Sequence, residues 1–386
     1  MIESSDPLAS PSPASLPVTS SSANGPRASD PTSRVALSIA DLGWDAGFQS
    51  VYETELESLD SSARESAVPG RVLRRDKTVC AVGLASGIRQ LTIAPALLAS
   101  PMDAPTTGDF VVVVGGEIRA VVERRTSVMR AGYRDLGAQV LAANVETVLA
   151  VSSLANSFRA RRIERLLVIA WQTGAIPIVV LTKADCCGDA RAIYDAAVAI
   201  APGCAVHVVS AITGEGVSGL AAELAPRTTS VMIGSSGAGK STLANALSDG
   251  QAGLATAEIR SDGKGRHTTV TRELVQLANG ALMIDTPGLR AIGLWDAEEA
   301  LADAFSDIEE LALGCRFNDC AHDREPGCAV SEAIAHGQLE SARLESYRRL
   351  QREQRRLAAR NDVRLRAERA AELRAFNKRQ KQQFYR

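Results

Sequence analysis

A glycine-rich loop at residues 234–241 has the spacing of a phosphate site. It reads Gly-Ser-Ser-Gly-Ala-Gly-Lys-Ser, and it lies between an apolar run at 230–233 and a helix-like stretch at 242–247. Such glycines let backbone N–H groups and a helix N-terminus face the phosphates. Lys240 would reach the β- and γ-phosphates, and the Ser241 hydroxyl would bind Mg²⁺. A structural turn is the alternative, but the Lys-Ser pair in this context favours a nucleoside triphosphate.

Two short motifs indicate which base is bound. Thr182-Lys183-Ala184-Asp185 follows an apolar run at 176–181, where open α/β sheets place their ligands. A carboxylate there accepts hydrogen bonds from the N1–H and 2-amino group of guanine, and adenine offers neither donor. Ser210-Ala211 follows the next apolar run, where guanine-binding folds contact the base carbonyl. Together the motifs predict guanine; if Asp185 were coincidental, an ATP-dependent enzyme would remain.

Two further motifs have the character of nucleotide switches. Asp285-Thr-Pro-Gly288 ends an apolar run at 281–284, so Asp285 could hold the Mg²⁺ shell and the Gly288 N–H could sense the γ-phosphate. Upstream, residues 265–269 read Gly-Arg-His-Thr-Thr in a polar stretch. We expect the hydroxyl of Thr269 to bind Mg²⁺, with Thr268 as the alternative.

The residue after the second switch motif leaves a gap in the catalytic machinery. Many GTPases carry a water-orienting Gln there, whereas this chain has Leu289. Leucine cannot orient water by hydrogen bonding, so intrinsic hydrolysis should be slow. His267 is the nearest candidate to polarise or deprotonate water, because imidazole titrates near neutral pH. A solvent-facing loop histidine is the alternative.

A cysteine and histidine cluster follows the switches. Cys315, Cys320, His322 and Cys328 have the spacing C-x4-C-x-H-x5-C. Three thiolates and one imidazole fill a tetrahedral zinc site and leave no position for water. The pattern therefore predicts one structural Zn²⁺ that fixes a loop-rich segment. The other cysteines show no such spacing and are interpreted as ordinary thiols.

These motifs give the full set of predicted site residues. The predicted nucleotide contacts are Thr182, Lys183, Ala184, Asp185, Ser210, Ala211, Gly234, Ser235, Ser236, Gly237, Ala238, Gly239, Lys240, Ser241, Thr242, Asp285 and Gly288. The predicted catalytic residues are His267, Lys240 and Thr269, and the predicted Mg²⁺ ligands are Ser241, Thr269 and Asp285.

The predicted secondary structure that positions these residues differs between three parts of the chain. Five β-type runs (70–75, 78–84, 87–94, 109–114 and 117–123) suit a small barrel of the oligonucleotide-binding kind, or a generic barrel without that role. From residue 141 to 292, short β-branched runs alternate with helical stretches such as 159–172 and 189–200, which indicates a parallel sheet covered on both faces. The chain is then mostly helical, and 338–382 reads as one long charged helix.

We therefore expect a multidomain α/β protein. Its predicted parts are a disordered low-complexity extension (1–60, clearest at 1–34), a barrel (65–138), a nucleotide domain (140–292) and a helical zinc-binding domain with a basic C-terminal helix (293–386).

Charge and cysteine usage restrict the environment and the partners. The net charge of −2 hides an asymmetry, since residues 343–386 hold fifteen Arg or Lys against five Asp or Glu. Such a tail favours a polyanionic partner, although solvated helix faces are often basic too. An odd cysteine count argues against a secreted disulfide framework, and we identify neither a signal peptide nor a membrane segment. We expect a cytoplasmic monomer.

The motif order adds a resemblance. The base motif precedes the phosphate loop, and this order together with the Cys/His spacing resembles the RsgA (YjeQ) family of circularly permuted bacterial GTPases. The resemblance covers about residues 65–350 and implies an oligonucleotide-binding-fold barrel, a permuted P-loop GTPase domain and a C-terminal zinc domain. It also implies GTP hydrolysis stimulated by the 30S subunit, with 16S rRNA as a partner, during late maturation of that subunit.

Carried over by residue, the family's nucleotide contacts fall on 182–185 and 234–242, its zinc ligands on the Cys/His cluster, and its switch histidine on His267. Residues 122–130 resemble the basic end of its barrel. The low-complexity N-terminus and the acidic region 53–65 depart from the family pattern.

Two hypotheses about mechanism follow. GTP turnover could be the purpose of the chain, or GTP could gate an RNA-binding module in which hydrolysis is incidental. Because the second switch leads directly into the zinc segment, nucleotide state could also reorient that segment on RNA.

Overall fold

The computed structural model describes residues 38–130, 139–155, 158–248, 272–285, 298–323 and 325–361. His267, Thr268, Thr269, Gly288 and Leu289 lie outside these ranges, as do residues 1–37 and the part of the predicted C-terminal helix beyond 361. Within the described helices, none is long and apolar enough to cross a membrane.

The first part of the fold is a closed five-stranded barrel. Its strands are β1 (Val68–Asp76), β2 (Val79–Leu84), β3 (Gly87–Ile93), β4 (Phe110–Val114) and β5 (Glu117–Val121). β1 pairs with β2 and β4, β3 pairs with β2 and β5, and β4 pairs with β5, so the ring closes in the order 1-2-3-5-4. This confirms the predicted oligonucleotide-binding-fold barrel. The short 3₁₀ turn η2 (Pro95–Leu98) follows β3.

Residues 38–60 are ordered, so the prediction of disorder is wrong for this part of the N-terminal extension. The segment forms η1 (Ile39–Leu42) and α1 (Ala46–Glu57), and α2 (Ser61–Ser66) follows. Asp45 caps α1 by accepting a hydrogen bond from the Phe48 N–H at 2.9 Å. Phe48 packs on Phe110 of the barrel, with ring centroids 4.4 Å apart. Aromatic burial against the barrel thus stabilises a segment that the prediction had grouped with the low-complexity residues 1–34.

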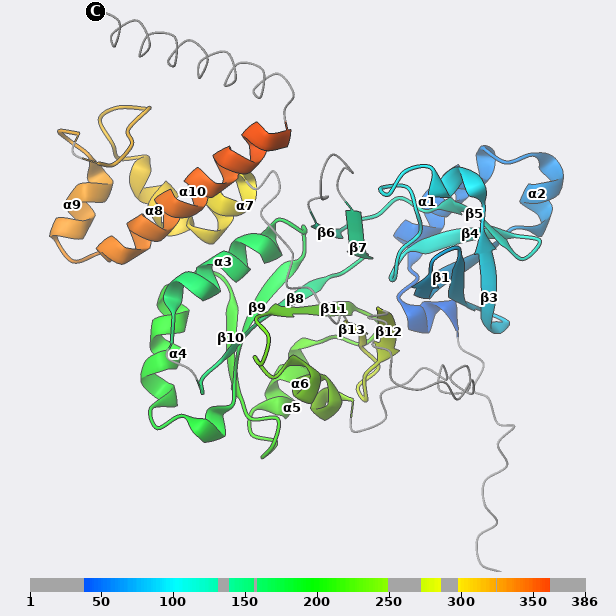
Figure 1. The fold of residues 1–386 in the computed structure, drawn as a ribbon, viewed down its shortest axis with the longest axis horizontal. Helices are drawn as coiled ribbons and strands as arrows, with labels where there is room; N and C mark the ends of the chain where they lie inside the picture. Colours follow the sequence, from blue (N-terminus) through cyan, green and yellow to red (C-terminus); the bar gives the residue numbers. More distant parts are fainter. Residues whose placement is uncertain are drawn as a thin grey trace, which may run out of the picture. The chain divides into compact units, whose positions relative to one another are not determined.

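The second part is the nucleotide-binding sheet (Figure 1). Its strands are β8 (Thr147–Ser153), β9 (Ile176–Thr182), β10 (Ala205–Val209), β11 (Thr229–Gly234), β12 (Glu273–Gln276) and β13 (Leu282–Asp285). The order is 10-9-8-11-13-12, parallel except for β12. The predicted parallel sheet is confirmed.

Helices cover both faces of this sheet (Figure 1). They are α3 (Ala160–Trp171), α4 (Ala190–Ala199), α5 (Val217–Glu223) and α6 (Lys240–Leu247). Side chains of α3 such as Ile163 and Leu167 pack in one buried cluster, and Leu220 of α5 and Leu243 of α6 pack in another. Neighbouring strand residues alternate between the two clusters, as the period of two in a β-strand requires.

Two strand pairings were absent from the sequence interpretation. β6 (Ser127–Arg130) and β7 (Gln139–Ala143) form an antiparallel pair across the predicted border between barrel and nucleotide domain. β12 pairs with the barrel through Arg74 and Glu273, which makes one continuous sheet of the two parts.

The third part is helical and packs on α3. It contains α7 (Glu298–Ala304), α8 (Ser306–Ala312), α9 (Ala329–Ala335) and α10 (Ser341–Asn361). Phe305 and Tyr347 belong to the same buried cluster as the inner side of α3. The helical part therefore shares a core with the nucleotide-binding part.

Candidate nucleotide site and metal centre

The glycine-rich loop connects β11 to α6, as its motif requires. Gly234 has φ 149°, and a Cβ atom there would lie 2.3 Å from the carbonyl oxygen of Val151. Gly239 has φ 87° and directly precedes the first residue of α6. Both positions therefore require glycine. Ser241 and Thr242 fall in the first turn of α6, where N–H groups lack intrahelical partners and can meet an anion.

Lys240 lies folded into this loop. Its Nζ donates to the carbonyl oxygens of Gly234 and Ser235, each at 2.9 Å. The ammonium thus lies against the backbone of the loop that would surround a triphosphate. Phosphate oxygens could replace these carbonyl oxygens as its acceptors.

Thr182 links the base motif to the phosphate loop. Its buried hydroxyl donates to the carbonyl oxygen of Ala238 at 2.6 Å. Sequence reasoning missed this role, because nothing in the spacing of the two motifs reveals that they touch. The stem of Lys183 lies beside Gly239, as expected for a side chain that braces the loop.

The carboxylate of Asp185 is exposed and held at both oxygens. The Ser210 hydroxyl donates to Oδ1 at 2.6 Å, and the Cys186 thiol donates to Oδ2 at 3.2 Å. The bond from Ser210 is the largest cause that lowers the pKa of Asp185 below its usual range. The structure thus gives Ser210 a side-chain role that the sequence interpretation did not include. The result is an ionised acceptor pair of the kind that guanine recognition needs.

The remaining predicted residues are only partly described. Ser235, Ser236, Gly237 and Ala238 lie in the loop, and Ala184 and Ala211 lie next to Asp185 and Ser210 in the chain. Asp285 is the last residue of β13, beside β11 in the sheet. The predicted catalytic His267 and Thr269, and the predicted sensor Gly288, lie outside the described residues.

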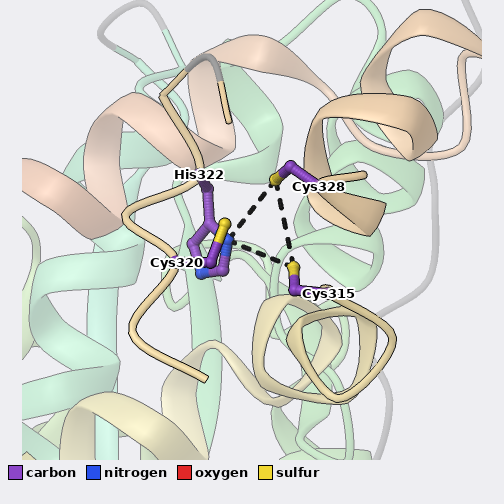
Figure 2. A group of neighbouring side chains, drawn as sticks. All are labelled: Cys315, Cys320, His322 and Cys328. Atoms are coloured by element: carbon purple, nitrogen blue, oxygen red, sulfur yellow. Dashed lines mark hydrogen bonds between the residues drawn. The ribbon is translucent and has the colours of Figure 1, made fainter. Parts of the chain in front are cut away.

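The predicted metal ligands converge. Cys315, Cys320, His322 and Cys328 place their ligand atoms within 4.8 Å of one another (Figure 2). Cys315 and Cys328 have their Sγ atoms 3.9 Å apart, and each Sγ lies 3.6 Å from Nδ1 of His322. A tetrahedral zinc ion with bonds of about 2.3 Å to sulfur and 2.05 Å to nitrogen requires separations of about 3.8 and 3.6 Å. The donor set and its spacing therefore fit such an ion.

Surrounding groups stabilise this arrangement. The Ser331 N–H donates to Sγ of Cys328 at 3.4 Å, and the Ser331 hydroxyl and Arg348 both donate to the carbonyl oxygen of His322. Burial alone would raise the pKa of Cys328, but the bonds from Ser331 help to lower it to about 6. His322 has φ 59°, a left-handed conformation that the surroundings must maintain.

Helix α10 fixes the metal segment to the nucleotide-binding core. Arg343 is 5% exposed and contacts Glu164 of α3 at 3.0 Å. It also makes two 2.7 Å hydrogen bonds to Asp307. One turn further along α10, Arg348 reaches the metal loop. The metal centre is thereby connected to α3 through one helix.

Comparisons with known proteins agree with this geometry. The RsgA GTPase family model matches residues 121–295. The small ribosomal subunit biogenesis GTPase RsgA of Streptomyces avermitilis is 46% identical over 340 residues, which cover 86% of this chain and 89% of that protein. The corresponding protein of Opitutus terrae is 41% identical over 353 residues, covering 86% and 94%.

Solved structures agree as well. YjeQ from Thermotoga maritima superposes with a TM-score of 0.57 at 25% identity, covering 74% of this chain and 97% of that one. YloQ, described as a circularly permuted GTPase, gives 0.54 at 26% identity, covering 77% and 96%. The chain is 46% identical to the Streptomyces avermitilis protein over most of both chains, and its permuted motifs lie on one sheet. It therefore belongs to the RsgA family of circularly permuted GTPases.

Proposed function

We propose that the small ribosomal subunit stimulates GTP hydrolysis by this chain, and that the reaction serves late maturation of the 30S subunit. The observation that carries the proposal is the 46% identity, over most of both chains, to a small ribosomal subunit biogenesis GTPase. The basic α10, with Arg348, Arg349 and Arg352 along it, supports a polyanionic partner such as 16S rRNA. The chain acts as a cytoplasmic monomer.

In this proposal the predicted site residues hold GTP. Asp185 accepts from the guanine ring, Thr182 and Lys183 brace the phosphate loop, and Lys240 neutralises the β- and γ-phosphates. Ser241, Thr269 and Asp285 bind Mg²⁺, and Gly288 senses the γ-phosphate.

The catalytic step needs a group that the sequence does not supply at the usual place. Leu289 stands where a water-orienting Gln is common. His267, a ribosomal group, or both would complete the site. This dependence is the reason why stimulation by the subunit should be large.

The metal is proposed to be one Zn²⁺ with a structural role. Three sulfur donors and one imidazole nitrogen at tetrahedral separations support this identity. Four protein ligands fill the coordination shell and exclude a metal-bound water, so no step of hydrolysis passes through this ion.

Turnover measured with purified 30S subunits tests the proposal. We expect the GTP hydrolysis rate to rise by orders of magnitude, on the scale of about 10³ or more seen when a partner completes a GTPase site. Matched amounts of 50S subunits are the control and should leave the rate unchanged. Equal rates with and without 30S subunits would refute the proposal. Tight, GTP-dependent binding to 30S subunits without faster turnover would favour the alternative, a GTP-gated RNA-binding module. The absence of the water-orienting Gln is the observation that favours this alternative.

A further inference from the structure

A cavity lies where the barrel, the β6–β7 pair and the start of β12 meet. Its volume is about 560 Å³. The polar lining that matters comprises Arg75 and Lys77 at the end of β1, Thr106 and Thr107 before β4, Gln139 of β7, and Arg272. None of these residues belongs to the nucleotide site or to the metal centre.

The charges around this cavity are predominantly positive. Asp76 is the single carboxylate among the lining residues, and Arg74 engages it at 2.9 Å. The ion pairs of the described barrel involve Arg74, Arg119, Arg124 and Arg125, and none includes Arg75 or Lys77. Two backbone carbonyls hold Arg75, at 3.1 and 2.8 Å. Arg75 is therefore fixed in place, and neither Arg75 nor Lys77 has a neutralising carboxylate among the described residues.

Arg272 provides the strongest evidence for an anion in this cavity. Its Nε is buried and has no hydrogen-bond partner in the part of the chain that the structure describes. Burial, together with the nearby charge of Arg130, lowers the pKa of Arg272. A buried donor without a partner costs about 1–3 kcal/mol, and more when it is charged. Because Thr107 donates to the Arg272 carbonyl oxygen at 3.3 Å, the residue is also tied to the barrel. Arg272 is also one of the residues that line the cavity, so an anion bound there would offset its charge.

We propose that the cavity between Arg75, Lys77 and Arg272 is a phosphate-binding site. Guanidinium groups bind phosphate in a bidentate manner, and the ammonium of Lys77 would add a further cationic donor. The volume lies within the usual range of ligand pockets, about 300–1,000 Å³, so a phosphate can enter with its attached sugar. The source is either an RNA phosphodiester or a free phosphorylated molecule. The RNA source rests on the proposed function, whereas the free source does not.

The position of the site gives it a consequence for the nucleotide site. Arg272 directly precedes β12, and β12 pairs with β13, which ends at Asp285. The preceding segment carries the predicted Thr269 and His267. A phosphate bound here therefore holds the first residue after that segment against the barrel.

The test compares Arg272→Gln with Arg119→Gln, a barrel variant of equal charge change that lies outside the cavity. One arm measures binding of inorganic pyrophosphate by calorimetry, with the nucleotide site saturated with GDP. The other measures binding to 30S subunits across a series of KCl concentrations. We expect Arg272→Gln to weaken binding about tenfold in at least one arm, and to lower the salt slope by about 0.9 if an RNA phosphate is lost.

The two arms separate the sources. Loss of pyrophosphate binding alone identifies a free phosphorylated ligand, and loss confined to the RNA arm identifies a phosphodiester. Lys77→Gln, in an exposed turn, repeats the test if Arg272→Gln does not fold. Identical behaviour of the cavity variants and Arg119→Gln in both arms overturns the proposal. The pyrophosphate arm contains no ribosome, so its result is independent of subunit-stimulated hydrolysis.

Discussion

The buried contact of Arg343 tests how firmly the metal segment is held to the GTPase core. Arg343→Met removes the guanidinium but keeps an unbranched apolar stem of similar length. The substitution abolishes the 3.0 Å contact with Glu164 and the paired bonds to Asp307. It also leaves the carbonyl oxygens of Ile200 and Ala304 without this donor.

The expected cost follows from the burial of the partner. Glu164 is 2% exposed, and its second oxygen already has no hydrogen-bond partner among the described residues. Removing one member of a buried pair typically costs about 3–5 kcal/mol, and two charges at ~4 Å interact by about 4 kcal/mol at an effective dielectric of 20. Glu164→Gln should cost only about 1 kcal/mol, because Arg343 keeps Asp307. The double variant Arg343→Met/Glu164→Leu should recover most of the loss, since no buried charge remains at Glu164.

Urea unfolding followed by circular dichroism measures these differences. Arg161→Met is the matched control, because Arg161 pairs with Glu345 across the same two helices but both side chains are at least half exposed. Such a pair contributes about 0–1 kcal/mol. The reasoning is wrong if Arg343→Met costs no more than Arg161→Met, or if the double variant is as unstable as Arg343→Met alone.

Three further predictions concern the base site, the metal and the thiols. Asp185→Asn should lower GTP affinity at least ~100-fold and favour xanthosine triphosphate in a competition assay, whereas Asp189→Asn, which alters only the cap of α4, should keep the preference for GTP. Cys328→Ser should reduce the metal content from about one ion per chain to near zero by elemental analysis, and an unchanged content would contradict the ligand assignment; Cys204→Ser is the control. Burial raises the pKa of Cys80 to about 12, so only about one in 10⁴ of its thiols is ionised at pH 8. Iodoacetamide should therefore label the exposed Cys186 and leave Cys80 unlabelled until the chain unfolds, as followed by mass spectrometry.

The sequence predicted those parts of the fold whose signals are local. Barrel strands such as β2 and the strands that end in motifs fall within a few residues of their expected positions, because turn residues and β-branched runs mark them. The metal ligands were predictable for the same reason: their spacing is short, and few other arrangements explain three cysteines and a histidine in fourteen residues.

The contacts between segments were not predictable. Arg343 lies in a run of charged residues that reads as a solvated helix face, yet it is buried against α3. Strand β12 has only four residues and no alternating pattern, so the link between barrel and nucleotide sheet has no sequence signal. For α1, a signal did exist: Asp45 is a typical N-cap, and Trp44, Phe48 and Tyr52 repeat at helical spacing. The prediction nevertheless grouped this segment with the low-complexity residues 1–34.

The packing of α10 against α3 around Arg343 also bears on how a change of bound nucleotide affects the rest of the chain. The sequence suggested that the second switch, which runs into the metal segment, reorients that segment. Separating α10 from α3 would expose the buried cluster that they share, which includes Phe305 and Tyr347, and exposing each fully buried side chain of this size costs about 1.5–3 kcal/mol. Inverting a population from 1:99 to 99:1 requires about 5.5 kcal/mol in total. Most of the difference between GTP and GDP binding would then be used before any other contact breaks.

Strand β12 is better placed to transmit a change at the nucleotide. On one side it pairs with β13 at four positions, ending at Asp285, and on the other it pairs with the barrel at the single position Arg74 and Glu273. A displacement of β13 therefore carries β12 with it, while one register pair and the hydrogen bond from Thr107 to the Arg272 carbonyl oxygen oppose a shift of β12 against the barrel. The structure thus changes the expected consequence of the permutation. We therefore expect the metal segment to move as one body with α3, and the contacts of the barrel, which lines one cavity together with Arg272, to follow the nucleotide.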